Sequence, residues 1–204
     1  MTLAGIVVAA GSGDRFGGPK HRILVAGVSM WERARDLLLD AGADPVVVVG
    51  DVPEGVPGGV RRRDSVAAGL AALGDRAEWV LIHDAARPLA SVALARRVVD
   101  RLEEGDVDGV VPTVPVRDTL KQVQGGMVAG TVDRDRLVAV QTPQGYRVAA
   151  LRKAQALDGD ATDEAVLLER AGRRVATVEG EAANLKVTFP GDLALVAALT
   201  GGRG

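Results

Sequence analysis

Unbroken apolar runs alternate with amphipathic stretches through the first half of the chain. Because they lack the apolar–polar alternation of a half-exposed strand, these runs indicate a sheet covered on both faces. Between them the pattern predicts helices, each opening near a serine or aspartate that can cap its first turn. Such alternation is typical of a parallel α/β sheet with right-handed crossovers. The predicted strands are Leu3–Ala9, Val46–Val49, Trp79–Ile82 and Gly109–Val114, and the predicted helices are Met30–Ala41 after Ser29, a helix through Leu73 capped by Asp64 or Ser65, and a helix from Ser91 to Glu104.

The pattern changes after Pro115, where residues alternate as in a hairpin. Thr119–Val123 and Met127–Val132 flank Gly125-Gly126, and Val138–Gln141 is the predicted return strand. The stretch is too polar to form a core, and an isolated hairpin is marginal in water. We therefore expect residues 115–142 to form a protruding β-arm that packs on another surface, for which a second subunit is a candidate.

The pattern after the arm predicts further helices and a strand of the same α/β domain. The length of the chain fits one domain over residues 1–204, with the arm as a subdomain. Beyond Pro143 we expect helices at Val148–Leu157, Asp163–Ala171 and Asp192–Leu199, a strand at Val175–Val178, and a β-like segment at Asn184–Thr188.

Composition narrows the possible functions. The chain of 204 residues has a net charge of −2 and no cysteine. Disulfides, cysteine-ligated metals and cysteine nucleophiles are therefore excluded, and nucleic-acid or membrane-surface binding is disfavoured. No apolar run approaches the roughly 20 residues of a membrane span. The expectation is a soluble cytoplasmic protein.

A glycine-rich loop follows the first predicted strand. Glycines at positions 11, 13, 17 and 18 let the backbone approach a ligand closely, and consecutive N–H groups in such a loop bind anions. Arg15 and Lys20 add positive charge, so the loop suits a polyphosphate. Phe16 breaks the dinucleotide fingerprint, and Pro19 with His21 breaks the Walker pattern. A plain glycine-rich turn is the alternative.

Charged residues also follow the third predicted strand. Ligands of parallel sheets bind beyond the carboxyl ends of the strands, where Asp84 could orient a hydroxyl and Arg87 could fork onto a phosphate. A salt-bridged turn is the alternative. With His21 and His83 as the only histidines, the ligands of a metal-dependent phosphohydrolase cannot be assembled.

Three further motifs have a structural alternative. The basic run Arg61–Arg63 could contact a nucleotide or form a solvated face. Lysine is scarce, so Lys186 could serve where a compact ammonium is needed, or could protect an edge strand. Thr162-Asp163-Glu164 is mainly indicative of a helix cap.

Taken in order, these motifs resemble the 2-C-methyl-D-erythritol 4-phosphate cytidylyltransferase family. The resemblance rests on segments spread over nearly the whole chain, namely Ala9–Arg15 with Pro19-Lys20, Arg62 with Asp64-Ser65-Val66, His83–Pro88, Pro115–Thr119, Thr131–Arg134, Thr142-Pro143-Gln144, Thr162–Ala165 and Asn184–Thr188. It implies a homodimeric, Rossmann-like nucleotidyltransferase. Such an enzyme would join CTP to a small sugar-alcohol phosphate, with Mg²⁺ or another divalent cation carried mainly by the CTP phosphates.

The resemblance also implies roles for individual residues. The catalytic residues would be Arg15, Lys20 and Lys186. The nucleotide would be held by Ala9, Ala10, Gly11, Gly13, Gly59, Ser65 and Ala85. The second substrate would be held by Asp84, Arg87, Thr131 from the partner's arm, and Arg147.

The chain departs from the family pattern in places. Asp51–Gly58 is short, so a helix common there is expected to be missing, and Val60 replaces an often polar residue. Arg147 is assigned only by allowing a shift of one position. The nearest alternative function is ribitol 5-phosphate cytidylyltransferase. A catalytically inactive nucleotide-binding module is another, whereas the absent fingerprint disfavours a nicotinamide oxidoreductase.

Overall fold

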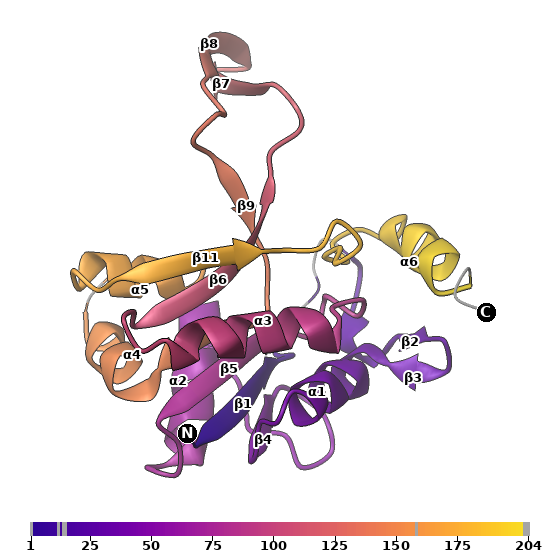
Figure 1. Cartoon of the computed structure of the whole chain (residues 1–204). Coiled ribbons are helices and arrows are strands. Elements are labelled where there is room, and N and C mark those ends of the chain that lie inside the picture. Colours follow the sequence, from indigo (N-terminus) through magenta and orange to yellow (C-terminus); the bar gives the residue numbers. More distant parts are fainter. Residues whose placement is uncertain (1, 12, 14–15, 158, 202–204) are drawn as a thin grey trace.

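One mixed sheet forms the centre of the molecule (Figure 1). A computed structural model of the chain describes residues 2–11, 13, 16–157 and 159–201. The sheet order is β11-β6-β10-β5-β1-β4, and β9 pairs with β6. The strands are β1 (Leu3–Val8), β4 (Val46–Val49), β5 (Trp79–Asp84), β6 (Gly109–Pro115), β9 (Val138–Val140), β10 (Gln144–Arg147) and β11 (Val175–Glu179).

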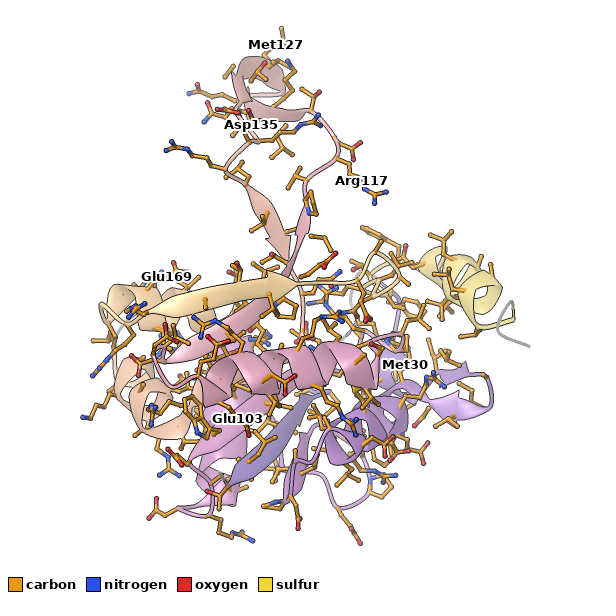
Figure 2. The ribbon with its side chains drawn as sticks, viewed as in Figure 1. Met30, Glu103, Arg117, Met127, Asp135 and Glu169 are labelled. Atoms are coloured by element: carbon orange, nitrogen blue, oxygen red, sulfur yellow. The ribbon has the colours of Figure 1, made fainter. Side chains whose placement is uncertain are left out.

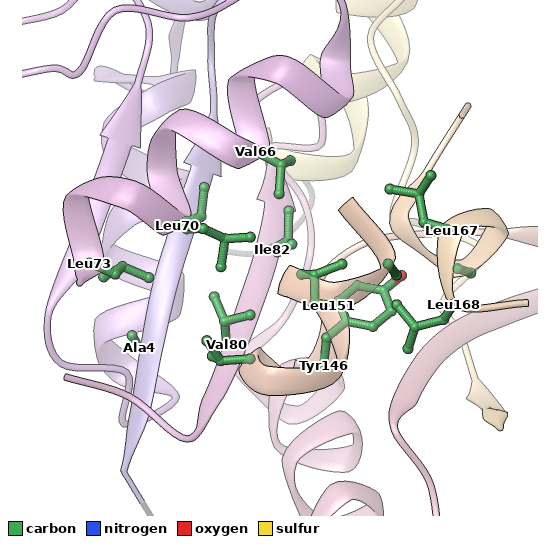
Figure 3. Packing of buried hydrophobic residues seen from close by; sticks show 14 of the residues in the cluster. Ala4, Val66, Leu70, Leu73, Val80, Ile82, Tyr146, Leu151, Leu167 and Leu168 are labelled. Atoms are coloured by element: carbon green, nitrogen blue, oxygen red, sulfur yellow. The ribbon is translucent and has the colours of Figure 1, made fainter. Parts of the chain in front are cut away.

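Helices cover both faces of the sheet, as the unbroken apolar runs predict. Along β1, Ala4 and Ile6 point into the cluster beneath α2, α4 and α5, whereas Leu3 and Val7 join the cluster beneath α1 and α3. Figure 3 shows the first cluster, where α2 leucines meet β5 and where Tyr146 packs against α4 and α5. The helices are α1 (Met30–Asp40), α2 (Arg62–Leu73), α3 (Val92–Glu103), α4 (Val148–Gln155), α5 (Glu164–Arg170) and α6 (Asp192–Gly201).

The predicted arm projects from the sheet. β7 (Leu120–Gln124) and β8 (Met127–Val132) pair antiparallel, and β9 returns the chain alongside the end of β6. Met127 lies at the far end of the arm, beyond the body of the molecule (Figures 1 and 2). Met127 is 74% exposed, so the arm leaves apolar surface uncovered within one chain.

Small elements connect the glycine loop to α1. The 3-10 helix η1 spans Lys20–Arg22, and the short strands β2 (Leu24–Val25) and β3 (Val28–Ser29) form a hairpin. Ser29 caps α1 as predicted, in a reciprocal pair with Glu32. In the described residues no helix is long and apolar enough to cross a membrane.

The predicted fold class is confirmed, but two local predictions are wrong, and the sequence pattern predicts no strand where β10 lies. β10 has no counterpart among the predicted strands, and it lies antiparallel between β5 and β6. Residues 184–188 are not a strand, because their backbone groups bond to side chains and to the loop after β5. α2 begins at Arg62, so Asp64 is its third residue and accepts the Arg61 N–H at 3.1 Å.

The segment from Asp51 to Gly58 contains no helix, as its length predicts. Val56 forms a single parallel bridge with Val49 instead. This short path leaves the end of β4 close to the glycine loop.

Candidate active site

A pocket of about 400 Å³ opens at the carboxyl ends of β1 and β5. This is the edge at which parallel sheets bind ligands. Backbone of the glycine loop, the start of α2 and the turn after β5 surround it. Its lining consists of Val8, Ala9, Ala10, Gly11, Gly13, Phe16, Lys20, His21, Gly59, Val60, Arg61, Arg62, Ser65, Asp84, Ala85, Ala86 and Lys186.

The described part of the glycine loop turns tightly around one carbonyl. The Gly13 oxygen accepts the N–H groups of Phe16, Gly17 and Gly18 at 2.7, 2.8 and 3.3 Å. Gly13 has a φ of +73°, and a Cβ built there would lie 1.9 Å from the Gly18 oxygen. Only glycine fits this position. At Gly11 and Gly13 the loop therefore presents backbone to the pocket, and Phe16 adds a side chain to the lining.

Lys20 connects the end of this loop to a segment distant in sequence. Its Nζ donates to the Val187 carbonyl oxygen at 2.9 Å. Val187 in turn donates its N–H to the Ala86 oxygen at 2.8 Å. The lysine ammonium is thus held at the pocket wall.

Asp84 ends β5 and carries the principal carboxylate of the pocket. Its Oδ1 accepts from Arg62 Nε and Nη2 at 3.2 and 3.0 Å, and its Oδ2 accepts from Lys186 Nζ at 2.7 Å. Burial alone would raise the pKa of Asp84, but Arg62 and Lys186 outweigh it and hold that pKa well below its usual value. Asp84 is therefore an ionised hydrogen-bond acceptor.

A buried hydrogen-bond chain supports Asp84 from below. Its backbone N–H donates to Thr142 Oγ1 at 3.1 Å, and that hydroxyl lies 2.8 Å from His83 Nδ1. His83 Nε2 lies 3.2 Å from the Arg87 carbonyl oxygen, which can only accept. The consistent assignment is a neutral His83 with its proton on Nε2. Burial lowers the pKa of His83 to about 4, which agrees with a neutral ring.

Close backbone approach shapes the side of the pocket next to α2. The Gly59 N–H donates to Ser65 Oγ at 3.1 Å. A Cβ at Gly58 would lie 2.2 Å from the Ala10 Cβ, and one at Gly59 would lie 2.3 Å from the Asp64 Cβ. The adjacent Val60 side chain is fully exposed. On this side of the pocket the chain segments therefore approach so closely that there is no room for side chains at positions 58 and 59.

Comparison with known proteins decides the family. The family model for 2-C-methyl-D-erythritol 4-phosphate cytidylyltransferase (IspD) matches residues 3–201. The chain belongs to this family. A Rhodococcus jostii member is 46% identical over 217 residues, which cover 97% of this chain and 94% of that protein. The predicted family is thus confirmed.

A solved structure and longer relatives agree with this assignment. The cytidylyltransferase of Thermus thermophilus superposes with a TM-score of 0.83 at 36% identity, covering 98% of this chain and 100% of that one. The bifunctional IspD/IspF enzyme of Nitratidesulfovibrio vulgaris is 48% identical over 193 residues, covering 93% of this chain but 46% of that protein. The chain therefore spans about half the length of its bifunctional relatives.

Most predicted site residues of this family meet in the pocket. The structure brings together Ala9, Ala10, Gly11, Gly13, Lys20, Gly59, Ser65, Asp84, Ala85 and Lys186. Arg15 lies outside the described residues. Distant stretches of sequence thus converge on one site, as the motif order predicts.

Arg87 lies behind the pocket wall and does not line it. Its Nη1 donates to the Asn184 oxygen at 2.8 Å and its Nη2 to the Val140 oxygen at 3.2 Å. Burial lowers the pKa of Arg87. The guanidinium therefore connects β9 to the segment that carries Lys186.

Thr131 is exposed on β8, in the arm, where its Oγ1 accepts from Lys121 Nζ at 2.6 Å. It does not line the pocket of its own chain. The prediction that Thr131 contacts the substrate therefore has no support within one chain.

Arg147 lies at the opposite end of the sheet. It pairs with Trp79, the first residue of β5, and its guanidinium stacks 4.3 Å from the centre of the Trp79 ring. Glu78 binds it at 3.2 Å. Trp79 is five positions before Asp84, which is about 17 Å along a strand. The prediction that Arg147 contacts the substrate has no support within one chain.

Arg62 lines the pocket but is not among the site residues predicted from the sequence. The arginine run at the start of α2 was the available signal, but it does not say which arginine turns inward. Arg61 and Arg62 both line the pocket, but Arg61 pairs with Asp64 at 2.8 Å, whereas Arg62 bonds to Asp84. Arg63 donates to backbone oxygens near residue 157. Only packing distinguishes the three.

Proposed function

We propose that this chain transfers a cytidylyl group from CTP to 2-C-methyl-D-erythritol 4-phosphate, giving CDP-methylerythritol and pyrophosphate in isoprenoid precursor synthesis. The observation that carries the proposal is the family match over residues 3–201. The pocket supports it, because the predicted nucleotide-binding residues and two lysines line one cavity. A cytoplasmic location is part of the proposal.

The reaction needs positioning and charge stabilisation more than a base. A phosphate oxygen of the alcohol phosphate attacks the α-phosphorus of CTP in line. A new P–O bond forms there as the bond to the bridging oxygen breaks, and pyrophosphate leaves with the electron pair. The nucleophile is already an anion, so no proton has to be removed. Arg15, Lys20 and the glycine-loop N–H groups would bind the triphosphate and stabilise the charge that develops on it.

A divalent cation, Mg²⁺ or a similar ion, would supply further charge neutralisation on the CTP phosphates. Among the described residues there is no group of three or more histidines or carboxylates that could hold a metal. Of the residues that the structure describes, Asp84 is the carboxylate that lines the pocket, and both of its oxygens accept from cations of the chain. We therefore assign the ion mainly to the nucleotide.

The second substrate would lie against Asp84 and Lys186. Asp84 would accept hydrogen bonds from its hydroxyl groups, and Lys186 would bind its phosphate. Arg87 would hold the Lys186 segment in place through the Asn184 oxygen. Thr131 would complete the site from the arm of a second subunit, in a homodimer formed through residues 115–142.

The experiment is a pyrophosphate-release assay with CTP, Mg²⁺ and either methylerythritol phosphate or ribitol 5-phosphate. We expect preferential turnover of methylerythritol phosphate. Preferential turnover of ribitol 5-phosphate would replace the assigned substrate, and no release with either would support an inactive nucleotide-binding module.

The variant Lys186→Ala tests the site itself. Loss of the ammonium should lower kcat/KM by roughly 10²- to 10³-fold, by analogy with the loss of an oxyanion donor. Lys153→Ala is the matched control, since Lys153 is exposed on α4 away from the pocket. A Lys186→Ala enzyme that is as active as this control contradicts the assigned role.

A further inference from the structure

Glu164 is a buried carboxylate outside the pocket that is connected to it through one side chain. It is the first residue of α5 and is 1% exposed. Its Oε2 accepts from Arg62 Nη1 at 2.5 Å. Burying a carboxylate costs free energy unless the charge is paired. The ion pair with Arg62 offsets this cost for Glu164.

The helix cap does not explain this ion pair. Asp163 is the cap of α5, and its Oδ1 accepts the Val166 N–H at 3.2 Å. Burial raises the pKa of Glu164, and Arg62 opposes that increase. The capping of α5 is thus supplied by Asp163, whereas the Glu164 carboxylate is paired with Arg62, which faces the site.

Arg62 is clamped between two carboxylates on opposite sides of its guanidinium. Arg62 donates from Nη1 to Glu164, and it donates from Nε and Nη2 to Asp84 Oδ1 at 3.2 and 3.0 Å. Asp84 Oδ2 remains for Lys186 Nζ at 2.7 Å. The four charges alternate in sign from the core to the pocket, and each ion fixes the orientation of the next.

We propose that Glu164 is a positioning residue that holds Arg62 on Asp84 and so orients the second-substrate side of the site. This inference rests on the proposed function. Without the Glu164 charge, Arg62 would carry a less compensated positive charge beside a pocket lined by Lys20 and Lys186. The guanidinium would turn toward bound phosphate, and Asp84 would lose the partner that orients it.

The kinetic test compares Glu164→Gln with Glu169→Gln. Both changes remove one negative charge from α5, but Glu169 is on the exposed face of the helix (Figure 2). We expect Glu164→Gln to raise KM for the alcohol phosphate about 10-fold, within the range of couplings carried by side-chain networks. KM for CTP should stay the same or fall, and Glu169→Gln should behave like the unchanged chain. Equal increases in both KM values would overturn the proposal.

A double variant separates positioning from general damage. If Glu164 acts through Arg62, adding Glu164→Gln to Arg62→Lys should lower kcat/KM by less than about 2-fold beyond Arg62→Lys alone. A full additional 10-fold loss would show that Glu164 acts by another route.

A spectroscopic readout works whether or not the proposed reaction is correct. The Arg62 Nε–H, held by Asp84, should give a slowly exchanging ¹H–¹⁵N resonance, assigned by its absence in Arg62→Lys. Glu164→Gln should shift or broaden that resonance, and Glu169→Gln should leave it in place. If the resonance is unchanged in Glu164→Gln, the inference fails even in an active enzyme. If the unchanged chain releases no pyrophosphate, the proposed function fails and the resonance still tests the clamp.

Discussion

The hydrogen bonds beneath Asp84 determine the charge of His83. The ring is fully buried, accepts from Thr142 at Nδ1 and donates from Nε2. A proton added at Nδ1 would face a hydroxyl that already donates in that direction. Neutral His83 is thus part of the support for the site, and its titration couples the site to the stability of the fold.

Stability should therefore fall as the solution is acidified. The pKa of His83 is about 4 in the folded chain, against an ordinary value of 6.5. Below about pH 6.5 the unfolded chain binds a proton that the folded chain does not, so the His83 contribution is full above that pH. It is lost progressively down to about pH 4, by about 3 kcal/mol in total.

Urea unfolding at a series of pH values checks this, with His83→Asn as the comparison. The variant should be less stable at neutral pH but should lose less stability on acidification. Groups such as His21, whose pKa is also lowered by burial, titrate in both proteins and cancel in the difference. Identical pH slopes for the two proteins would contradict a neutral buried His83.

At the scale of elements, β10 joins the two halves of the sheet. It pairs antiparallel with both β5 and β6, and its Gly145 lies directly beneath α3. A Cβ on Gly145 would lie 2.5 Å from Leu102 Cδ1 and 2.8 Å from Val98 Cγ1. The strand and helix can pack this closely only because that side chain is absent.

The variant Gly145→Ala should therefore destabilise the fold by about 1–3 kcal/mol through overpacking. Gly130→Ala is the matched control, since Gly130 is also a strand glycine, but its nearest contact for a Cβ is Gln122 Oε1 at 3.6 Å. Denaturant unfolding of both variants gives the comparison. Equal midpoints would mean that α3 moves away from β10 at little cost.

At the scale of the whole molecule, one chain contains an incomplete site under the proposed function. The pocket lies in the body, whereas Thr131 is on the arm. The arm carries exposed apolar residues with no core beneath them, including Val123, Met127 and Val128. In a twofold dimer each arm would contribute to the site of the other chain.

Mixing two inactive variants tests this arrangement. Lys186→Ala and Thr131→Ala, unfolded and refolded together, should regain about one quarter of normal activity, because half of the pairs are mixed and each mixed dimer has one intact site. Each variant treated alone in the same way is the control. No recovery, with dimers verified by light scattering, would place Thr131 and Lys186 in the same site of one chain or outside the site.

Part of the structure could be predicted from local pattern. Buried strands such as β1 and β5 are evident because residues covered on both faces must be apolar throughout. The cap at Ser29 is evident because the chemistry that ends a helix is local. The family is evident from motif order, since the spacing of Asp84, Lys186 and the glycine loop along the chain carries information that no single motif does.

Other features could be decided only by the tertiary structure, because they depend on which distant groups are within reach. β10 is too short to show the apolar–polar alternation of a strand. It is a strand because its backbone pairs with both β5 and β6, between which it lies. The composition of residues 184–188 is typical of a strand. Their carbonyl oxygens instead accept hydrogen bonds from the side chains of Arg87 and Lys20. The inward turn of Arg62 follows from two buried carboxylates placed by other elements. The chain thus determines by itself which segments are buried and which chemistry it carries, and the fold decides which charges meet, because the energy of an ion pair depends on distance and burial that no local pattern contains.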